Sequence, residues 1–322
     1  MCMITRRMVI AGSGALALLS ATAQAQDQTL RIVYPFPAGN KADTIARLFA
    51  DRLQKRLHRS VIVENRSGAA GRIGARAVKD ASTDGPMLLF AVSSQMTLQP
   101  HLYSDVGYDP FADFASVSQI MTFEQAVAVP AGSVVKSVQE LVAWYKANPE
   151  QAVYGSPGAG TGPHIVAAEF ARAFQLNLKH VAYRGTAAAL PDLLAARIPA
   201  YFAASAELIE QHNAGKLRIL ATGGTQRSPD LPAVPTFAES GADIVATGWY
   251  AIYAPIRTKR EVIENLEQEM IAITHDPEIY SRIEALGFRP TGTTAAELRN
   301  IHRAEFDHWR QVVAVTGLKG EP

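Results

Sequence analysis

Short apolar runs alternate along this chain with longer segments in which apolar side chains recur every three to four residues. Residues 30–34 form one such run, and Ile45, Leu48, Phe49 and Leu53 follow at helical spacing, which predicts a strand and then an amphipathic helix. Because the alternation continues to the C-terminus, the pattern predicts an α/β chain with mostly parallel sheets. The predicted strands are 30–34, 61–64, 87–91, 126–129, 180–183, 199–204, 219–222 and 247–255, and the predicted helices are 42–57, 68–78, 137–148, one from 163, 189–196, one from 259 and 294–316.

The same pattern gives three local expectations. Residues 109–117, which begin with Asp-Pro-Phe, are expected to form a connection. Ser137 and Glu140 have the spacing of a capping box at a helix start. In the helix that begins near Lys259, Val262 falls on the inward face with the apolar residues that follow at helical spacing.

A glycine-rich loop precedes the helix that begins near Pro163. It carries glycines at positions 155, 158, 160 and 162, with hydroxyls from Ser156 and Thr161. The first N–H groups of a helix have no partner inside the helix, and the helix dipole adds partial positive charge there, so the loop is suited to bind an anion. Its spacing differs from GxGxxG, from a P-loop and from a nucleophile elbow. An ordinary strand-to-helix connection therefore stays an alternative.

Two further junctions between a predicted strand and a helix combine glycine with polar side chains, at 38–43 and 185–188. Ligands of open α/β sheets bind beyond the carboxyl ends of the strands, so junctions from two facing lobes would form one cleft. We expect this cleft to capture a small anion, with a carboxylate as the favoured class. Lys41 and Arg184 would supply charge-assisted hydrogen bonds, and the alternative for each is a solvated surface charge.

Residues 1–25 have the pattern of a signal peptide. An Arg-Arg pair precedes an apolar run over 8–19, and small residues at 23–25 form a cleavage site. The run is too short to span a membrane. We therefore expect an exported mature chain that begins near Gln26, by the general secretory or the twin-arginine route.

Composition narrows the class of protein further. The chain has 322 residues and 48% hydrophobic content, which is enough for a large core and fits two domains better than one. A formal net charge of +1 argues against nucleic acid as a partner. Cys2 is the only cysteine and precedes the apolar run, so the mature chain has no disulfide and no thiolate metal site.

Metal-binding and catalytic patterns are weak in this sequence. His302, Glu305 and His308 fall near one face of the last helix, where we expect exposed helix decoration rather than a metal site, and no HExxH motif or EF-hand loop occurs. We expect neither a metal nor a cofactor. A serine hydrolase needs a nucleophile, a base and an orienting acid, and Ser156 has no such partners at recognisable spacing. An exported hydrolase is therefore the weakest alternative.

Short motifs along essentially the whole mature chain resemble those of one family. They are Tyr34-Pro35-Phe36-Pro37-Ala38-Gly39, Val63-Glu64-Asn65-Arg66-Ser67-Gly68, Tyr108-Asp109-Pro110, Tyr154-Gly155-Ser156-Pro157-Gly158, Tyr183-Arg184-Gly185-Thr186, Gly215-Lys216-Leu217-Arg218 and Gly248-Trp249-Tyr250. In this order they are similar to the substrate-binding proteins of tripartite tricarboxylate transporters, the Bug family.

The resemblance implies a two-lobe type II periplasmic binding protein fold, with crossover strands as a hinge and a cleft between the lobes. Residues 26–123 and 246–322 would form the first lobe, and 124–245 the second. The protein would be a periplasmic monomer without covalent chemistry. It would close on a small organic carboxylate and deliver it to membrane permease subunits. The alternative from another class is a periplasmic sensor subunit that presents the same fold to a membrane kinase.

The resemblance also implies which residues hold the ligand through main-chain amides, hydroxyls and water. They are Phe36, Ala38, Gly39, Asn40, Lys41, Asp43 and Ser93 before residue 124, and Ser156, Gly160, Thr161, His164, Arg184, Gly185, Thr186 and Ala187 in the second lobe. Asn40, Lys41, Arg184 and Ala200 stand where the family usually has glycine, a small or neutral residue, lysine and often aspartate. An added cation and a missing acid favour a fully anionic ligand over an amino acid.

Overall fold

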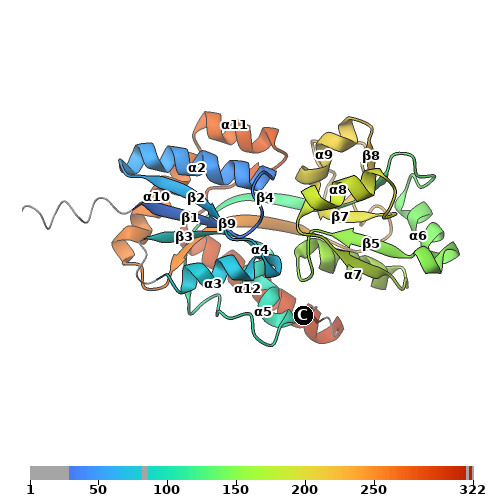
Figure 1. The fold of residues 1–322 in the computed structure, drawn as a ribbon, viewed down its shortest axis with the longest axis horizontal. Coiled ribbons are helices and arrows are strands. Elements are labelled where there is room, and N and C mark those ends of the chain that lie inside the picture. The colour runs from blue at the N-terminus through green and yellow to red at the C-terminus, as the bar shows by residue number, and fades with distance from the viewer. Residues whose placement is uncertain (1–28, 82–85, 317–318, 321–322) are drawn as a thin grey trace, which may run out of the picture.

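The computed structural model describes residues 29–81, 86–316 and 319–320. They form two lobes that two long strands connect (Figure 1). Each lobe has a central sheet with helices on both faces, as the alternation of strands and helices predicts. The expected signal peptide over residues 1–25 lies outside the described residues.

Three parallel strands form the base of the first lobe. Strand β1 pairs with β2 on one side and with β3 on the other, and helices α2 and α3 cover opposite faces (Figure 1). Every residue of β3 is buried, which is typical of an inner strand covered on both faces. The elements are β1 (Leu30–Tyr34), α2 (Lys41–Leu57), β2 (Val61–Asn65), η1 (Ala69–Gly71), α3 (Arg72–Lys79), β3 (Met87–Val92), α4 (Ser93–Thr97) and α5 (Gln99–Leu102).

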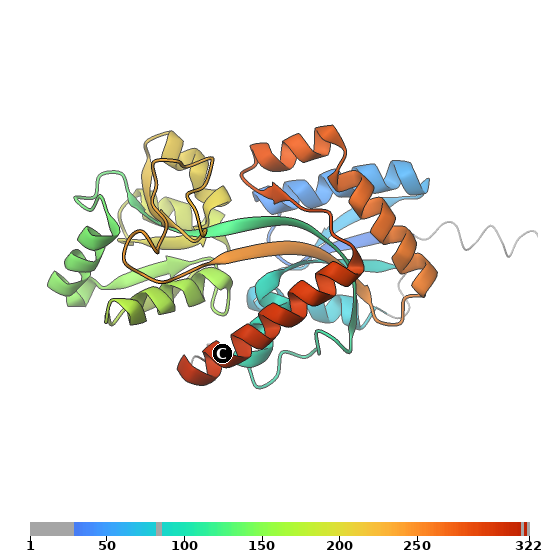
Figure 2. The same cartoon turned by 180° about the vertical axis from the view of Figure 1, so that it is seen from behind.

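Two long strands run side by side from one lobe to the other (Figure 2). Strand β4 (Phe114–Pro130) first pairs antiparallel with β9 (Thr247–Pro255), and from Gln125 onward it pairs with strands of the second lobe. Because β4 begins at Phe114, the expectation that all of 109–117 is a connection is wrong. The polar side chain of Ser116 is buried inside the sheet and interrupts the apolar run by which a buried strand is recognised.

The second lobe has a parallel set of its own, in which β5 pairs with β6 and with β7. Together with the antiparallel pairs of β4 and β9, this gives a mixed sheet. The Glu140 amide donates to Ser137 Oγ at 3.1 Å, as the capping box predicts, but the Glu140 carboxylate accepts from the Lys136 amide at 2.6 Å instead of from the Ser137 amide. The elements are α6 (Val138–Ala147), η2 (Pro149–Gln151), β5 (Val153–Ser156), α7 (Gly162–Ala173), β6 (Lys179–Ala182), α8 (Thr186–Leu194), β7 (Tyr201–Ala204), α9 (Ser205–Asn213) and β8 (Leu217–Thr222).

After β9 the chain returns to cover the first lobe. Helices α10 and α11 pack near α2, and α12 runs across the opposite side toward the crossover strands (Figure 2). The inward placement expected for Val262 is wrong, because α10 buries Leu266 and Met270 and leaves Val262 46% exposed. Within the described ranges, no helix has the length and apolar character needed to cross a membrane. The elements are α10 (Arg260–Thr274), α11 (Pro277–Ala285), β10 (Arg289–Pro290) and α12 (Ala295–Thr316).

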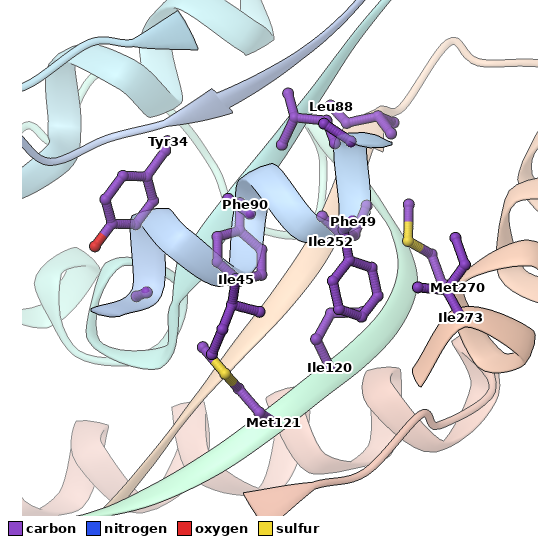
Figure 3. Close-up of a cluster of buried hydrophobic side chains, with 14 of the residues drawn as sticks. Tyr34, Ile45, Phe49, Leu88, Phe90, Ile120, Met121, Ile252, Met270 and Ile273 are labelled. Carbon is purple, nitrogen blue, oxygen red and sulfur yellow. The ribbon is translucent and has the colours of Figure 1, made fainter. Parts of the chain in front are cut away.

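Each lobe has its own apolar core. In the first lobe, Phe49 of α2, Ile252 of β9 and Met270 of α10 meet between the sheet and its covering helices (Figure 3). In the second lobe, Phe170 and Phe202 belong to a separate cluster. Burial of each such side chain contributes about 1.5–3 kcal/mol. The first-lobe cluster also includes Ala206 of α9, so the two lobes touch beside the crossover strands.

Candidate ligand-binding site

A cavity of ≈ 90 Å³ lies between the lobes. Tyr34, Val92 and Ala204 are the last residues of β1, β3 and β7, and all three line it. This is the position that ligands take in open α/β sheets. The other lining residues are Phe36, Asn40, Ser93, Ser94, Phe123, Gln125, Pro157, Thr161, Gly162, Pro163, Gly185, Thr186, Glu207, Thr247, Tyr250, Glu305 and Trp309.

Helices from both lobes begin at this cavity. Asn40, Thr161, Gly185 and Ala204 are the N-cap residues of α2, α7, α8 and α9, and Ser93 begins α4. All of them line the cavity. The amide groups and dipoles of helix starts favour a negative charge by about 0.3–1 kcal/mol each, and by up to about 2 kcal/mol when partly buried. The cavity is therefore suited to a small anion.

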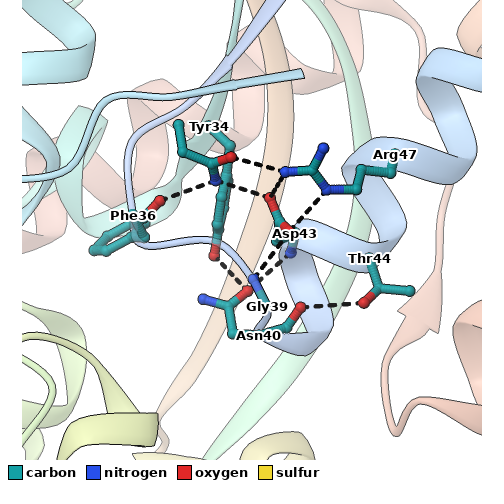
Figure 4. Close-up of polar contacts among 8 residues, drawn as sticks. Tyr34, Phe36, Gly39, Asn40, Asp43, Thr44 and Arg47 are labelled. Carbon is teal, nitrogen blue, oxygen red and sulfur yellow. Dashed lines mark hydrogen bonds and ion pairs between the residues drawn. The ribbon is translucent and has the colours of Figure 1, made fainter. Parts of the chain in front are cut away.

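The turn that enters α2 is held by its own side chains (Figure 4). Asn40 Oδ1 accepts hydrogen bonds from the Asp43 amide at 2.8 Å and from the Tyr34 hydroxyl at 3.0 Å. Asp43 Oδ2 accepts from the Gly39 amide at 3.0 Å and from Arg47 Nε at 2.9 Å. Burial alone would raise the pKa of Asp43, but these hydrogen bonds outweigh it and lower the pKa. Asp43 thus stabilises the turn and does not line the cavity.

The loop before α7 is also held by internal hydrogen bonds. The Gly160 amide donates to His164 Nδ1 at 3.0 Å, and Thr161 Oγ1 donates to the Gly158 carbonyl at 2.7 Å. Ser156 Oγ hydrogen-bonds to His180 Nε2 at 2.7 Å, a pair that the sequence did not indicate. Ser156 is fully buried and outside the cavity lining, so this hydroxyl orders the loop and is not presented to a ligand.

The two cations expected to face the ligand lie elsewhere. The Arg184 side chain is exposed and outside the cavity lining. Lys41 Nζ donates to the Ala206 carbonyl of the second lobe at 2.5 Å, so this ammonium joins the lobes.

The predicted site residues therefore fall into two groups. The structure brings six of them together in the cavity wall: Phe36, Asn40, Ser93, Thr161, Gly185 and Thr186. It places nine outside the wall, in the turns that support it or on the surface: Ala38, Gly39, Lys41, Asp43, Ser156, Gly160, His164, Arg184 and Ala187.

Two acidic residues of the wall were not predicted as site residues. Burial raises the pKa of Glu207, although the charge and the main-chain amide of Lys41 oppose this effect. Burial also raises the pKa of Glu305, against hydrogen bonds from Trp249, Trp309 and Thr97. The sequence did single out Glu305, because it falls near the same face of the last predicted helix as His302. No sequence signal distinguished Glu207 from other acidic helix residues.

The expectation of exposed decoration along α12 is wrong for His302. Its side chain is 1% exposed, and its ring nitrogens lie 3.0 Å from the Met96 carbonyl and 3.3 Å from the Tyr253 hydroxyl. Helix α12 packs against α4, which buries this face. In the part of the chain that the structure describes, no cluster of three metal-ligating side chains occurs.

Gln125 lies on β4 where the strand passes between the lobes. It lines the cavity, and no described residue hydrogen-bonds to its buried Oε1 atom. Buried polar atoms are nearly always paired with protein, water or ligand. The unpaired oxygen therefore makes Gln125 a candidate hydrogen-bond acceptor of the cavity wall.

Comparison with known proteins identifies the family. The model of the tripartite tricarboxylate transporter family receptor matches residues 45–318. The chain belongs to this family. It is 30% identical to a protein from the tcbD-tcbE intergenic region of Pseudomonas sp. strain P51, over 96% of this chain and 94% of that protein. It is 29% identical to the protein BugT of Bordetella pertussis, over 90% of both chains.

Solved structures give the same family and fold. The periplasmic binding protein BugD superposes with a TM-score of 0.84 at 27% identity, over 90% of this chain and 98% of that chain. A protein of R. palustris, Rpa4515 with adipate, superposes with a TM-score of 0.85 at 27% identity, over the same shares. Members of this family are periplasmic solute-binding receptors and not enzymes, and the two-lobe fold expected from the resemblance is confirmed.

Proposed function

We propose that this chain is a periplasmic receptor that captures a small organic carboxylate between its lobes and delivers it to a tripartite permease. The observation that carries the proposal is the convergence of helix starts from both lobes on one cavity. The relative Rpa4515 was solved with adipate, which supports a carboxylate as the ligand class.

The cavity limits the ligand to a small molecule. A buried water molecule needs a cavity of about 10–15 Å³. The cavity of ≈ 90 Å³ therefore accommodates a molecule of several non-hydrogen atoms rather than a peptide. The carboxylate would accept hydrogen bonds from main-chain amides at the starts of α7 and α8 and from the hydroxyl of Thr186. The hydrogen bond from the Gly160 amide to His164 would hold the loop before α7 in place.

Lobe closure would enclose the ligand. We keep the division into residues 26–123 with 246–322 and 124–245 as part of this proposal. Two contacts between these lobes support a closed form, from Lys41 to the Ala206 carbonyl and from Arg289 to Asp230 at 2.6 Å. Closed protein would then present the surfaces of both lobes to the permease.

Ligand-dependent thermal stability tests the proposal. A ligand that binds only the native state stabilises it by about 2.7 kcal/mol at a hundred times its Kd. Mature protein should therefore show a raised melting midpoint with at least one member of a panel of mono-, di- and tricarboxylates, aromatic ones included. Amino acids, sugars and inorganic phosphate serve as controls. A midpoint that no carboxylate raises would contradict carboxylate capture.

A further inference from the structure

The carboxylate of Glu207 reaches from the second lobe to the first. Glu207 lies in the first turn of α9 and lines the cavity. Burial raises the pKa of Glu207, and the charge and main-chain amide of Lys41, the first residue of α2, oppose this rise, which places the carboxylate near the start of that helix. The ammonium of Lys41 bonds to the neighbouring Ala206 carbonyl. A carboxylate of the protein therefore occupies the helix start that would attract a ligand carboxylate in the first lobe.

The other amides of this turn are engaged as well. The Gly39 amide donates to Asp43 Oδ2, and the Asp43 amide donates to Asn40 Oδ1. Side chains of the protein thus take two amides of the turn, and the Glu207 carboxylate lies near the amide of a third residue, Lys41.

Glu305 adds a second protein carboxylate to the cavity wall from α12. Its oxygens accept hydrogen bonds from the indole nitrogens of Trp249 and Trp309 and from the hydroxyl of Thr97. The hydrogen-bond donors around Glu305 thus bind its own carboxylate. A ligand carboxylate placed beside Glu207 or Glu305 would meet like charge.

The starts of α7 and α8 offer a different environment. Thr161 and Gly185 cap the starts of α7 and α8 beside Thr186, and these two helices have twelve and nine residues. Their amides and dipoles favour a negative charge. The favourable position for a ligand carboxylate is therefore at the starts of α7 and α8.

Aromatic side chains line the space that remains. Phe36, Phe123, Tyr250 and Trp309 belong to the wall, and the rings of Phe123 and Tyr250 lie 5.3 Å apart. Such a surface favours an apolar ligand body, because contact removes apolar area from water.

We propose that Glu207 makes this receptor selective for monocarboxylates with an apolar body and excludes dicarboxylates. The inference rests on the proposed function and narrows its ligand class. One carboxylate would bind at the starts of α7 and α8. Glu207 fills the place of a second carboxylate at the start of α2 and repels one nearby, so selectivity comes from an unfavourable element for the competitor.

Matched ligand pairs test this assignment by isothermal titration calorimetry. Hexanoate and adipate differ by one carboxylate at the same chain length, as benzoate and terephthalate do at the same ring. Wild-type mature protein should bind the monocarboxylate of at least one pair about tenfold or more tightly than its dicarboxylate. Glu207→Gln should tighten the dicarboxylate by about tenfold and change the monocarboxylate by less than about threefold.

Glu210→Gln is the matched control, since Glu210 lies on the same helix and is exposed. It should leave both affinities unchanged. Glu207→Ala provides a second variant in case Glu207→Gln does not fold. A wild-type preference for the dicarboxylate, or an equal change for both ligands in the Glu207 variants, would overturn the selectivity and leave carboxylate capture intact. A panel in which no carboxylate binds would overturn both proposals.

Discussion

Lys41 Nζ donates a hydrogen bond to the Ala206 carbonyl at 2.5 Å, and this bond joins the start of α2 in the first lobe to the start of α9 in the second. Hydrogen bonds from a charged group contribute about 1.5–3 kcal/mol. We predict that Lys41→Ala disfavours the closed form and weakens the bound carboxylate by about tenfold. Small-angle scattering with saturating ligand should show a larger radius of gyration than for wild type.

Lys55→Ala is the control for this change. Lys55 lies on the same helix, is 61% exposed and pairs with Asp51 one turn away. Its loss should alter neither affinity nor radius. Identical affinities and radii for Lys41→Ala and wild type would show that the bond has no part in closure.

Thr186 and Arg184 should differ in their effect on ligand affinity. Thr186 is buried at the start of α8 and lines the cavity, whereas Arg184 is exposed outside the lining. We predict that Thr186→Val weakens carboxylate binding by about tenfold, since a neutral hydrogen bond contributes about 0.5–1.5 kcal/mol and a charged one more. Arg184→Ala should change affinity by less than about twofold. Titration calorimetry measures both affinities. A larger loss of affinity in Arg184→Ala than in Thr186→Val would show that the Arg184 guanidinium contacts the ligand.

Asn40 should contribute to stability as well as to the cavity. It caps α2 and accepts the Tyr34 hydroxyl bond. Removal of an N-cap costs about 0.5–2 kcal/mol, so Asn40→Ala should lower the free energy of unfolding by about 1–2 kcal/mol. Denaturant titration measures it. Thr44→Ala is the control, because Thr44 is exposed and its hydroxyl contacts the Asn40 carbonyl at 3.3 Å. Equal losses in the two variants would contradict the capping role.

His302 should make the protein less stable in acid. Burial, the largest effect, lowers the pKa of His302 from 6.5 to about 4, so the folded chain keeps the ring neutral where the unfolded chain protonates it. Between these values the unfolded state binds more protons, and stability falls as the pH falls. The full difference corresponds to about 3 kcal/mol below pH 4.

Replacement of His302 by phenylalanine checks this effect. Denaturant titrations at pH 7, 5.5 and 4 should show a smaller acid loss for His302→Phe than for wild type. The carboxylates titrate alike in both proteins, so the difference isolates the imidazole. Parallel pH profiles would show that His302 is protonated as easily in the folded chain as in the unfolded one.

The regular elements of the first lobe were largely predictable from apolar spacing. The strand over Leu30–Tyr34 has the predicted bounds, and α2 begins one residue before the predicted start at 42. In these elements, burial of one or both faces fixes the spacing at which apolar residues recur along the sequence. The start of β4 was missed, because Ser116 is polar and yet buried in the sheet, so its burial depends on partners distant in sequence.

The site residues that lie at helix starts were predictable from the sequence. Asn40, Thr161 and Thr186 follow from glycine-bearing junctions, since the local chain alone creates a free helix start. Lys41 was predicted as a cation that faces the ligand, and its proximity to Glu207 did not follow from the sequence. They come together only because the lobes face each other across 166 positions of chain, and no local pattern encodes that approach.

Helix α12 lies at the end of the chain and supplies Glu305 and Trp309 to the cavity wall. The same helix contributes Leu298 to an apolar cluster of the first lobe. One helix therefore couples the packing of the first lobe to the shape of the proposed binding site, so damage to its packing would reach the cargo-binding surface as well.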